Sequence, residues 1–135
     1  MVVQWRGAMT TGSPILDNDH QILIGLLNNV EKAIDTQTLE GVGSALEDVL
    51  QYTVDHFERE ELIQAQIHYS DAKNHKKLHA DLRNQILHLN EKFKSTTDQV
   101  QKKELATELH SFLNDWLVKH IMHEDIKIRP LVDKR

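Results

Sequence analysis

Histidines and carboxylates at helical spacing constrain this chain more than any other feature of its sequence. Residues of these two kinds recur four apart in the middle of the chain and also stand near its two ends, at His20, His56, Glu60, His75, His79 and His120. Side chains at positions i and i+4 project from the same face of an α-helix. The spacing therefore predicts several helices, each with imidazole or carboxylate groups on one side.

The same positions lie inside rows of apolar residues that advance in steps of three and four. Four rows can be traced, over 20–34, 46–67, 75–93 and 105–120. Such steps follow the turn of a helix and give it one buried face. No alternation of useful length favours a strand. The rows predict an all-α fold, an up-down-up-down four-helix bundle that forms one domain over residues 1–135.

Local signals predict where the second helix starts. Residues 36–43, TQTLEGVG, contain two glycines and predict a loop. Ser44 and Glu47 are spaced as in a capping box, which would start the helix there, although a start nearer Thr38 also fits.

The later boundaries are predicted in the same way. A turn is expected around residues 68–70. Thr96 and Gln99 stand in capping-box register at the start of the fourth helix. Pro130 cannot continue a hydrogen-bonded helix interior, so the fourth helix should end before it.

Composition narrows the functional classes. The 135 residues are 39% hydrophobic and 27% charged, which is typical of a soluble globular domain. A net charge of −5 disfavours nucleic acid as a partner. The absence of cysteine excludes disulfides, thiolate zinc sites and iron–sulfur clusters, and fits a cytoplasmic protein. No secretion signal or membrane span is apparent, so no membrane partner is expected.

Polar groups on the inner rows need partners. Each unpaired polar group buried in a core costs about 1–3 kcal/mol. A shared metal centre removes that cost because the metal uses the ligand lone pairs. A hydrogen-bonded polar core is the alternative, but it rarely needs five imidazoles. Zinc normally takes four ligands or fewer, so this mixed nitrogen and oxygen set suits a pair of iron-like ions better.

The order of these groups along the chain predicts a single cluster. His20 and the pair His75/His79 lie near the start of their helices, whereas the pair His56/Glu60 and His120 lie toward the end of theirs. In an up-down bundle these four regions share one level. The remaining histidines are expected outside the cluster: His88 and His110 exposed, His68 in a turn, and His123 in an outer layer around the site.

Four segments resemble the motifs of the hemerythrins, in particular the single-domain bacterial hemerythrin-like proteins. The segments are LDNDH (16–20), HFEREE (56–61), HKKLH (75–79) and WLVKHIMHED (116–125). The resemblance implies a protein that binds O2 reversibly at a non-haem di-iron centre, for oxygen transport, storage or sensing, and is not an enzyme.

The resemblance also implies seven ligands to two iron ions that share an oxo or hydroxo bridge. His75, His79 and His120 would hold one iron, and His20 and His56 would hold the other. Glu60 and Asp125 would bridge the two irons, and the second iron would keep an open position for O2.

One ligand is ambiguous, because helical periodicity favours Glu124 at i+4 from His120. Asp125 at i+5 lies about 140° away around an ideal helix. The family spacing favours Asp125, which requires the helix to loosen or end there.

Five apolar residues match positions that wall the oxygen pocket in the family: Leu23, Phe57, Trp116, Leu117 and Ile121. They also fit an ordinary core. Two alternatives use the same ligands: a di-iron enzyme that handles peroxide, O2 or nitric oxide, and a signalling module that responds to iron or oxygen.

Overall fold

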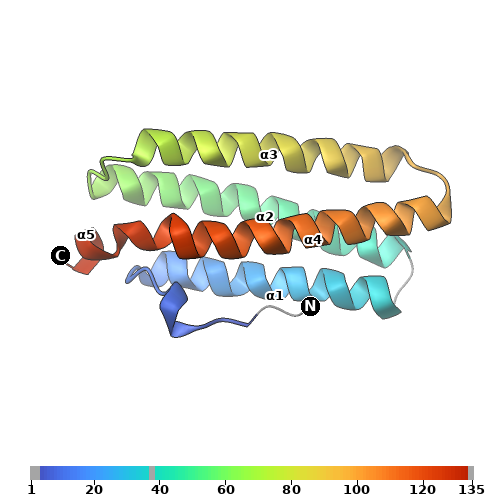
Figure 1. Cartoon of the computed structure of the whole chain (residues 1–135), viewed down its shortest axis with the longest axis horizontal. Coiled ribbons are helices and arrows are strands. Elements are labelled where there is room, and N and C mark those ends of the chain that lie inside the picture. Colours follow the sequence, from blue (N-terminus) through green and yellow to red (C-terminus); the bar gives the residue numbers. More distant parts are fainter. Residues whose placement is uncertain (1–3, 37–38, 134–135) are drawn as a thin grey trace.

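Four long antiparallel helices make up most of the chain. The computed structural model describes residues 4–36 and 39–133, and the helices in it are α1 (Pro14–Thr36), α2 (Leu39–Gln66), α3 (Ala72–Ser95) and α4 (Gln99–His123). Neighbouring helices run in opposite directions, and α1 and α3 each pack against α2 and α4 (Figure 1). The predicted up-down-up-down bundle is confirmed.

Short elements lie at the two ends of the bundle. They are η1 (Gly7–Met9), η2 (Asp125–Ile128) and α5 (Arg129–Asp133). The Arg129 side chain donates from Nε to the Thr10 carbonyl oxygen over 2.8 Å, which ties the chain after α4 to the segment before α1. Pro130 stands in the first turn of α5, where its missing N–H has no helical partner to lose. As predicted, α4 ends before it.

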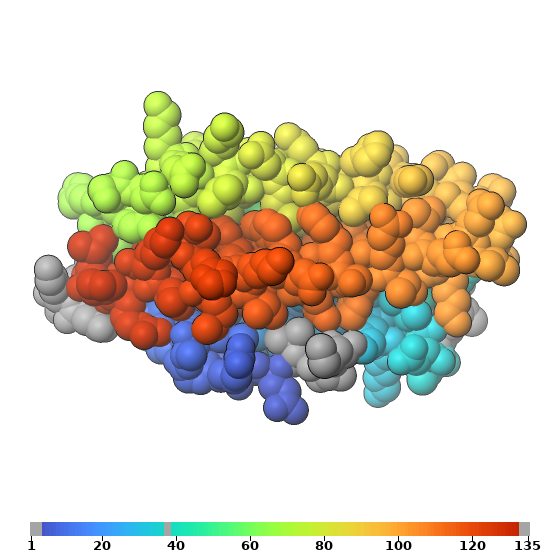
Figure 2. Space-filling model, in the orientation of Figure 1, coloured from blue at the N-terminus to red at the C-terminus, as the bar shows by residue number. Residues whose placement is uncertain are grey.

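The apolar faces of the four helices form a continuous core. α1 buries Leu23, Leu27 and Val30, and each of the other helices contributes a comparable row. In α4 the buried face is rotated from the predicted row. Leu109 and His120 are buried as expected, but Leu113 and Leu117 fill the core, while Leu105, Phe112 and Trp116 are only partly buried. Figure 2 shows the outer side chains of α4 across one face of the molecule.

The predicted loop over 36–43 is wrong for residues 39–43, which are helical. Gly41 and Gly43 lie inside α2, and neither has a positive φ. A Cβ on Gly43 would lie 3.6 Å from a ring carbon of Phe93 on α3, so the glycine permits close packing there. Burial of Val42 and Leu46 outweighs the low helix propensity of glycine. The Ser44 start is therefore wrong. The alternative, Thr38, lies outside the described residues.

The turn around residues 68–70 is confirmed. His68 adopts a left-handed conformation with φ of 55°, and the Tyr69 N–H donates to the Gln64 carbonyl over 2.9 Å. This pattern closes the end of α2. No helix in the described part of the chain is long and apolar enough to cross a membrane.

The predicted cap of α4 is also corrected. Asp98 is the N-cap, and its carboxylate accepts from the N–H groups of Val100 and Gln101 at 2.9 and 3.1 Å. Thr96 instead closes α3, since its hydroxyl donates to the Lys92 carbonyl over 2.7 Å.

Replacing the capping carboxylate tests this assignment. Asp98→Ala should lower the free energy of unfolding by about 0.5–2 kcal/mol, because two backbone donors lose their acceptor. Urea unfolding followed by circular dichroism measures the change. Thr96→Ala is the matched control and should cost less. A larger loss in Thr96→Ala would restore the capping box read from the sequence.

Candidate metal centre

All seven predicted ligands meet inside one end of the bundle. They form two overlapping clusters in which the ligand atoms of each cluster lie within 4.8 Å of one another. One cluster contains Glu60, His75, His79, His120 and Asp125, and the other contains His20, His56, Glu60 and Asp125. The two carboxylates belong to both clusters, and all seven side chains are buried.

The antiparallel fold produces this convergence. His20 lies in the second turn of α1 and His75 in the first turn of α3, whereas Glu60 lies toward the end of α2 and His120 near the end of α4. The starts of α1 and α3 and the ends of α2 and α4 occupy the same end of the bundle (Figure 1).

Each carboxylate divides its two oxygens between the two histidine groups. Asp125 places Oδ1 at 2.8 Å from His120 Nε2 and 3.0 Å from His75 Nε2, and places Oδ2 at 2.8 Å from His20 Nε2. The two sides of the site are therefore joined through one carboxyl group.

Glu60 is divided in the same way. Its Oε1 contacts His75 Nε2 and lies 3.5 Å from His79 Nε2, while Oε2 lies 2.8 Å from His56 Nε2. Two carboxylates arranged like this can each bind two cations at once.

The clustered nitrogen and oxygen atoms are better placed to bind metal ions than to hydrogen-bond to one another. Nε2 of His120 faces Nε2 of His75 at 3.0 Å and Nε2 of His79 at 3.2 Å, so three ring nitrogens converge on one point. Several ligand atoms have no hydrogen bond of acceptable geometry despite short contacts: Nε2 of His20 and of His56, Oε2 of Glu60, and both carboxyl oxygens of Asp125. Lone pairs buried together without donors are satisfied by cations.

Electrostatics keeps the carboxylates ionised. Burial by itself raises the pKa of Glu60, but the close contacts of its oxygens with the surrounding histidine nitrogens outweigh it and hold the pKa well below the usual value. The pKa of Asp125 is also lowered, with burial again opposed by the histidines. Conversely, burial lowers the pKa of His20, yet the two carboxylates raise it to about 9. Both carboxylates therefore stay ionised at neutral pH, and ionised carboxylate oxygens can bind cations.

The change of backbone at the end of α4 determines the directions of the Asp125 and Glu124 side chains. α4 stops at His123, and Asp125 begins the 3-10 helix η2 with 1% of its surface exposed. Glu124 turns outward, where its carboxylate pairs with Lys127 Nζ at 3.2 Å. The loosened backbone brings Asp125, and not Glu124, to His120.

Comparisons with known proteins place this chain in a family. The family model described as the hemerythrin HHE cation binding domain matches residues 11–132. The chain belongs to the hemerythrin family. It is 25% identical over 121 residues to a bacteriohemerythrin of Pseudomonas aeruginosa, covering 90% of this chain and 75% of that protein.

Two further similarities extend over nearly the whole chain. A hemerythrin-like protein of Naegleria gruberi is 29% identical over 125 residues, which covers 93% of this chain and 89% of that protein. A crystal structure of wild-type hemerythrin superposes with a TM-score of 0.85 and 26% identity, covering 98% of each chain.

The carboxylate of Asp19, for which no sequence pattern predicts a role, binds one of the histidines from outside the site. The Nδ1–H of His56 donates to Asp19 Oδ2 over 3.0 Å, which leaves Nε2 with its lone pair toward the site. Arg59 donates to both oxygens of Asp19 at 2.8 Å, and the Tyr52 hydroxyl donates over the same distance. Asp19 directly precedes His20, and only tertiary packing brings it to α2.

The other histidines depart partly from expectation. His110 is buried, not exposed, because the buried face of α4 is rotated toward it, and its Nε2 lies 3.1 Å from the Leu27 carbonyl oxygen. His88 is exposed as predicted, and His68 is exposed in its turn. His123 is exposed as well, which contradicts a role in an outer layer around the site.

Aromatic rings brace the three-histidine side. Phe57 stacks on His79 with ring centroids 3.8 Å apart, and Trp116 stacks on His120 at 4.2 Å. Of the other predicted pocket residues, Leu23 and Leu117 line a small internal cavity together with Trp116. Ile121 is fully buried but lines none of the cavities described below.

Removing the outer carboxylate should be costly. Asp19→Ala leaves Tyr52, Arg59 and His56 without their common acceptor, so the free energy of unfolding should fall by about 1–3 kcal/mol. Denaturant titration at neutral pH measures it. Asp48→Ala, at an exposed position of α2, is the control and should change stability little. Equal stabilities for the two variants would show that the Asp19 network contributes nothing.

Proposed function

We propose that this protein binds O2 reversibly at a pair of non-haem iron ions. The observation that carries the proposal is the division of both Glu60 and Asp125 between two groups of histidines. In this arrangement two cations share the negative charge of two buried carboxylates, and each cation keeps its own imidazoles.

The two sides of the site are unequal. His75, His79 and His120 would hold one ion, while His20 and His56 would hold the other, with Glu60 and Asp125 shared. The second ion has one protein ligand fewer and so has room for an external molecule. When bound, a di-iron pair supplies the two electrons that reversible O2 uptake requires.

The surroundings favour binding over turnover. The cavity one helical turn from the site is lined by aliphatic side chains, the indole of Trp116 and one hydroxyl, that of Thr53. This hydroxyl donates to the Val49 carbonyl over 2.7 Å, so it is not directed at a bound molecule. Dry walls exclude water and offer no acid to a bound molecule, which disfavours the alternative of a peroxidase or oxidase.

Iron loading tests the proposal directly. Protein loaded anaerobically with Fe²⁺ should contain two iron ions per chain and should develop a visible absorption band on exposure to O2. Removal of O2 should reverse the band. Metal analysis and absorption spectroscopy measure both. A chain that binds one iron or none contradicts the proposal. So does an iron-loaded chain whose absorption spectrum does not change with O2.

The two acidic residues after α4 separate the proposed ligand from its neighbour. Asp125→Ala should lose one iron per chain, since two cations then lack a shared ligand. Glu124→Ala should keep both irons, because an exposed ion pair with Lys127 contributes little. Metal content per folded chain measures the difference, with Glu60→Ala as the positive control. Iron loss in Glu124→Ala but not in Asp125→Ala would exclude Asp125 as the bridge.

A further inference from the structure

A small cavity lies in the core one helical turn from the site. Its walls come from all four long helices: Leu23, Leu27, Val49, Thr53, Leu82, Leu113, Trp116 and Leu117. Leu23 follows His20 by three residues, Thr53 precedes His56 by three, and Leu82 follows His79 by three. The cavity has a volume of about 10 Å³, close to the minimum for one water-sized molecule.

A second apolar space opens beside it, between α2 and α3. This cleft has a volume of about 20 Å³ and is lined by Leu50, Thr53, Val54, Phe57, Arg83, Ile86 and Leu87. Leu87 is 51% exposed and Arg83 is partly exposed, so the cleft reaches the surface there. Thr53 belongs to the walls of both spaces and separates them.

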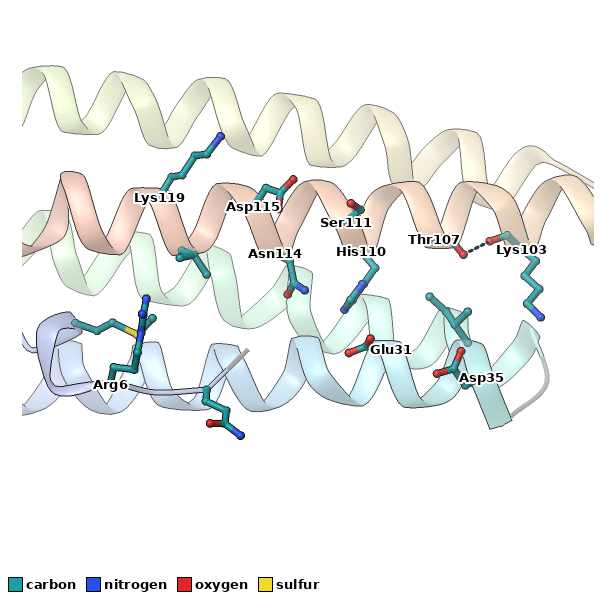
Figure 3. A pocket seen from close by; sticks show the side chains of 14 residues that line it. Arg6, Glu31, Asp35, Lys103, Thr107, His110, Ser111, Asn114, Asp115 and Lys119 are labelled. Carbon is teal, nitrogen blue, oxygen red and sulfur yellow. Dashed lines mark hydrogen bonds between the residues drawn. The ribbon is translucent and has the colours of Figure 1, made fainter. Parts of the chain in front are cut away.

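The hollows on the other faces do not share a wall with the core cavity. One of them, about 960 Å³, is the groove between α1 and α4, and charged groups such as Asp35, Lys103 and Lys119 line it. In Figure 3 His110 points from α4 toward Glu31 of α1 across this groove. Another hollow is lined by Tyr52, Arg59 and Asp19, and the last two form an ion pair over 2.8 Å.

We propose that O2 reaches the site through the cleft between α2 and α3, past Thr53, and through the core cavity. This route rests on the proposed function for its ligand, an apolar diatomic gas. Such a solute partitions into apolar space, while ions and bulk water remain in the charged groove. Because the Thr53 hydroxyl is bound to the Val49 carbonyl, no free hydroxyl lies in the passage. The route requires side-chain motion of Thr53 to join the two spaces.

The route can be tested without iron by O2 quenching of Trp116 fluorescence. The full chain carrying Trp5→Phe, which leaves Trp116 as the single tryptophan, is loaded with redox-inert Zn²⁺. In this background Thr53→Leu should reduce the bimolecular O2 quenching constant about threefold or more, since it fills the wall between the two spaces. Thr53→Ala should increase it. Fluorescence lifetimes at several O2 pressures give the constants.

Thr107 supplies the matched control. It is an exposed threonine on α4 whose hydroxyl also donates to a helix carbonyl, that of Lys103, over 3.0 Å. Thr107→Leu and Thr107→Ala should leave the quenching constant unchanged. If Thr53 and Thr107 variants quench alike, the route is wrong. Val54 is half-buried and lines the cleft between α2 and α3, so Val54→Phe should also reduce the O2 quenching constant. This variant replaces Thr53→Leu in the test if Thr53→Leu does not fold.

A second quencher separates passage through the cleft from general opening of the bundle. Acrylamide is too large and polar for the cleft, so its quenching of Trp116 should not respond to Thr53. Parallel changes for acrylamide and O2 would overturn the route. Failure of the iron-loaded protein to bind O2 would contradict the proposed function, whereas the zinc experiment would still report whether O2 passes Thr53.

Discussion

Two buried carboxylates surrounded by five imidazoles are the constraint on which the rest of this structure depends. Glu60 is 0% and Asp125 is 1% exposed, inside a core that is otherwise mostly aliphatic. Burying one charge of this kind without a partner is strongly unfavourable, and here two of the same sign lie together. The histidines offset that cost in part. Cations shared between both carboxylates offset it more fully, and the divided oxygens fit such cations.

The backbone around the site brings the carboxylates and the histidines together. Two histidines arrive on α3 at i and i+4, which a regular helix provides, but Asp125 needs α4 to end at His123. The segment that follows is anchored by Arg129 to the Thr10 carbonyl, at the other end of the chain. Asp19 of α1 holds His56 of α2 from outside, and the next residue on α2, Phe57, stacks on His79.

The spacing of residues along each helix was enough to predict the four helices and the position of most candidate ligands. Steps of three and four gave the helices, and up-down order put the ligand pairs at one level, because both follow from helix geometry alone. The predicted start of α2 at Ser44 was wrong because glycines suggest a loop until the packing of Gly43 against Phe93 is known. His110 and the role of Asp19 were missed for a related reason: each depends on a partner helix distant in sequence. The seven candidate ligands were predicted from the motifs of the family, and the choice of Asp125 over Glu124 required the family spacing, since helical periodicity pointed the other way.

Anomalous diffraction at the iron absorption edge, from crystals of the iron-loaded protein, tests the central claim most directly. The account predicts two anomalous peaks in each molecule. One should lie among His75, His79 and His120 and the other beside His20 and His56, with Glu60 and Asp125 each contacting both. A single peak, or two peaks with either carboxylate bound to only one of them, would contradict it.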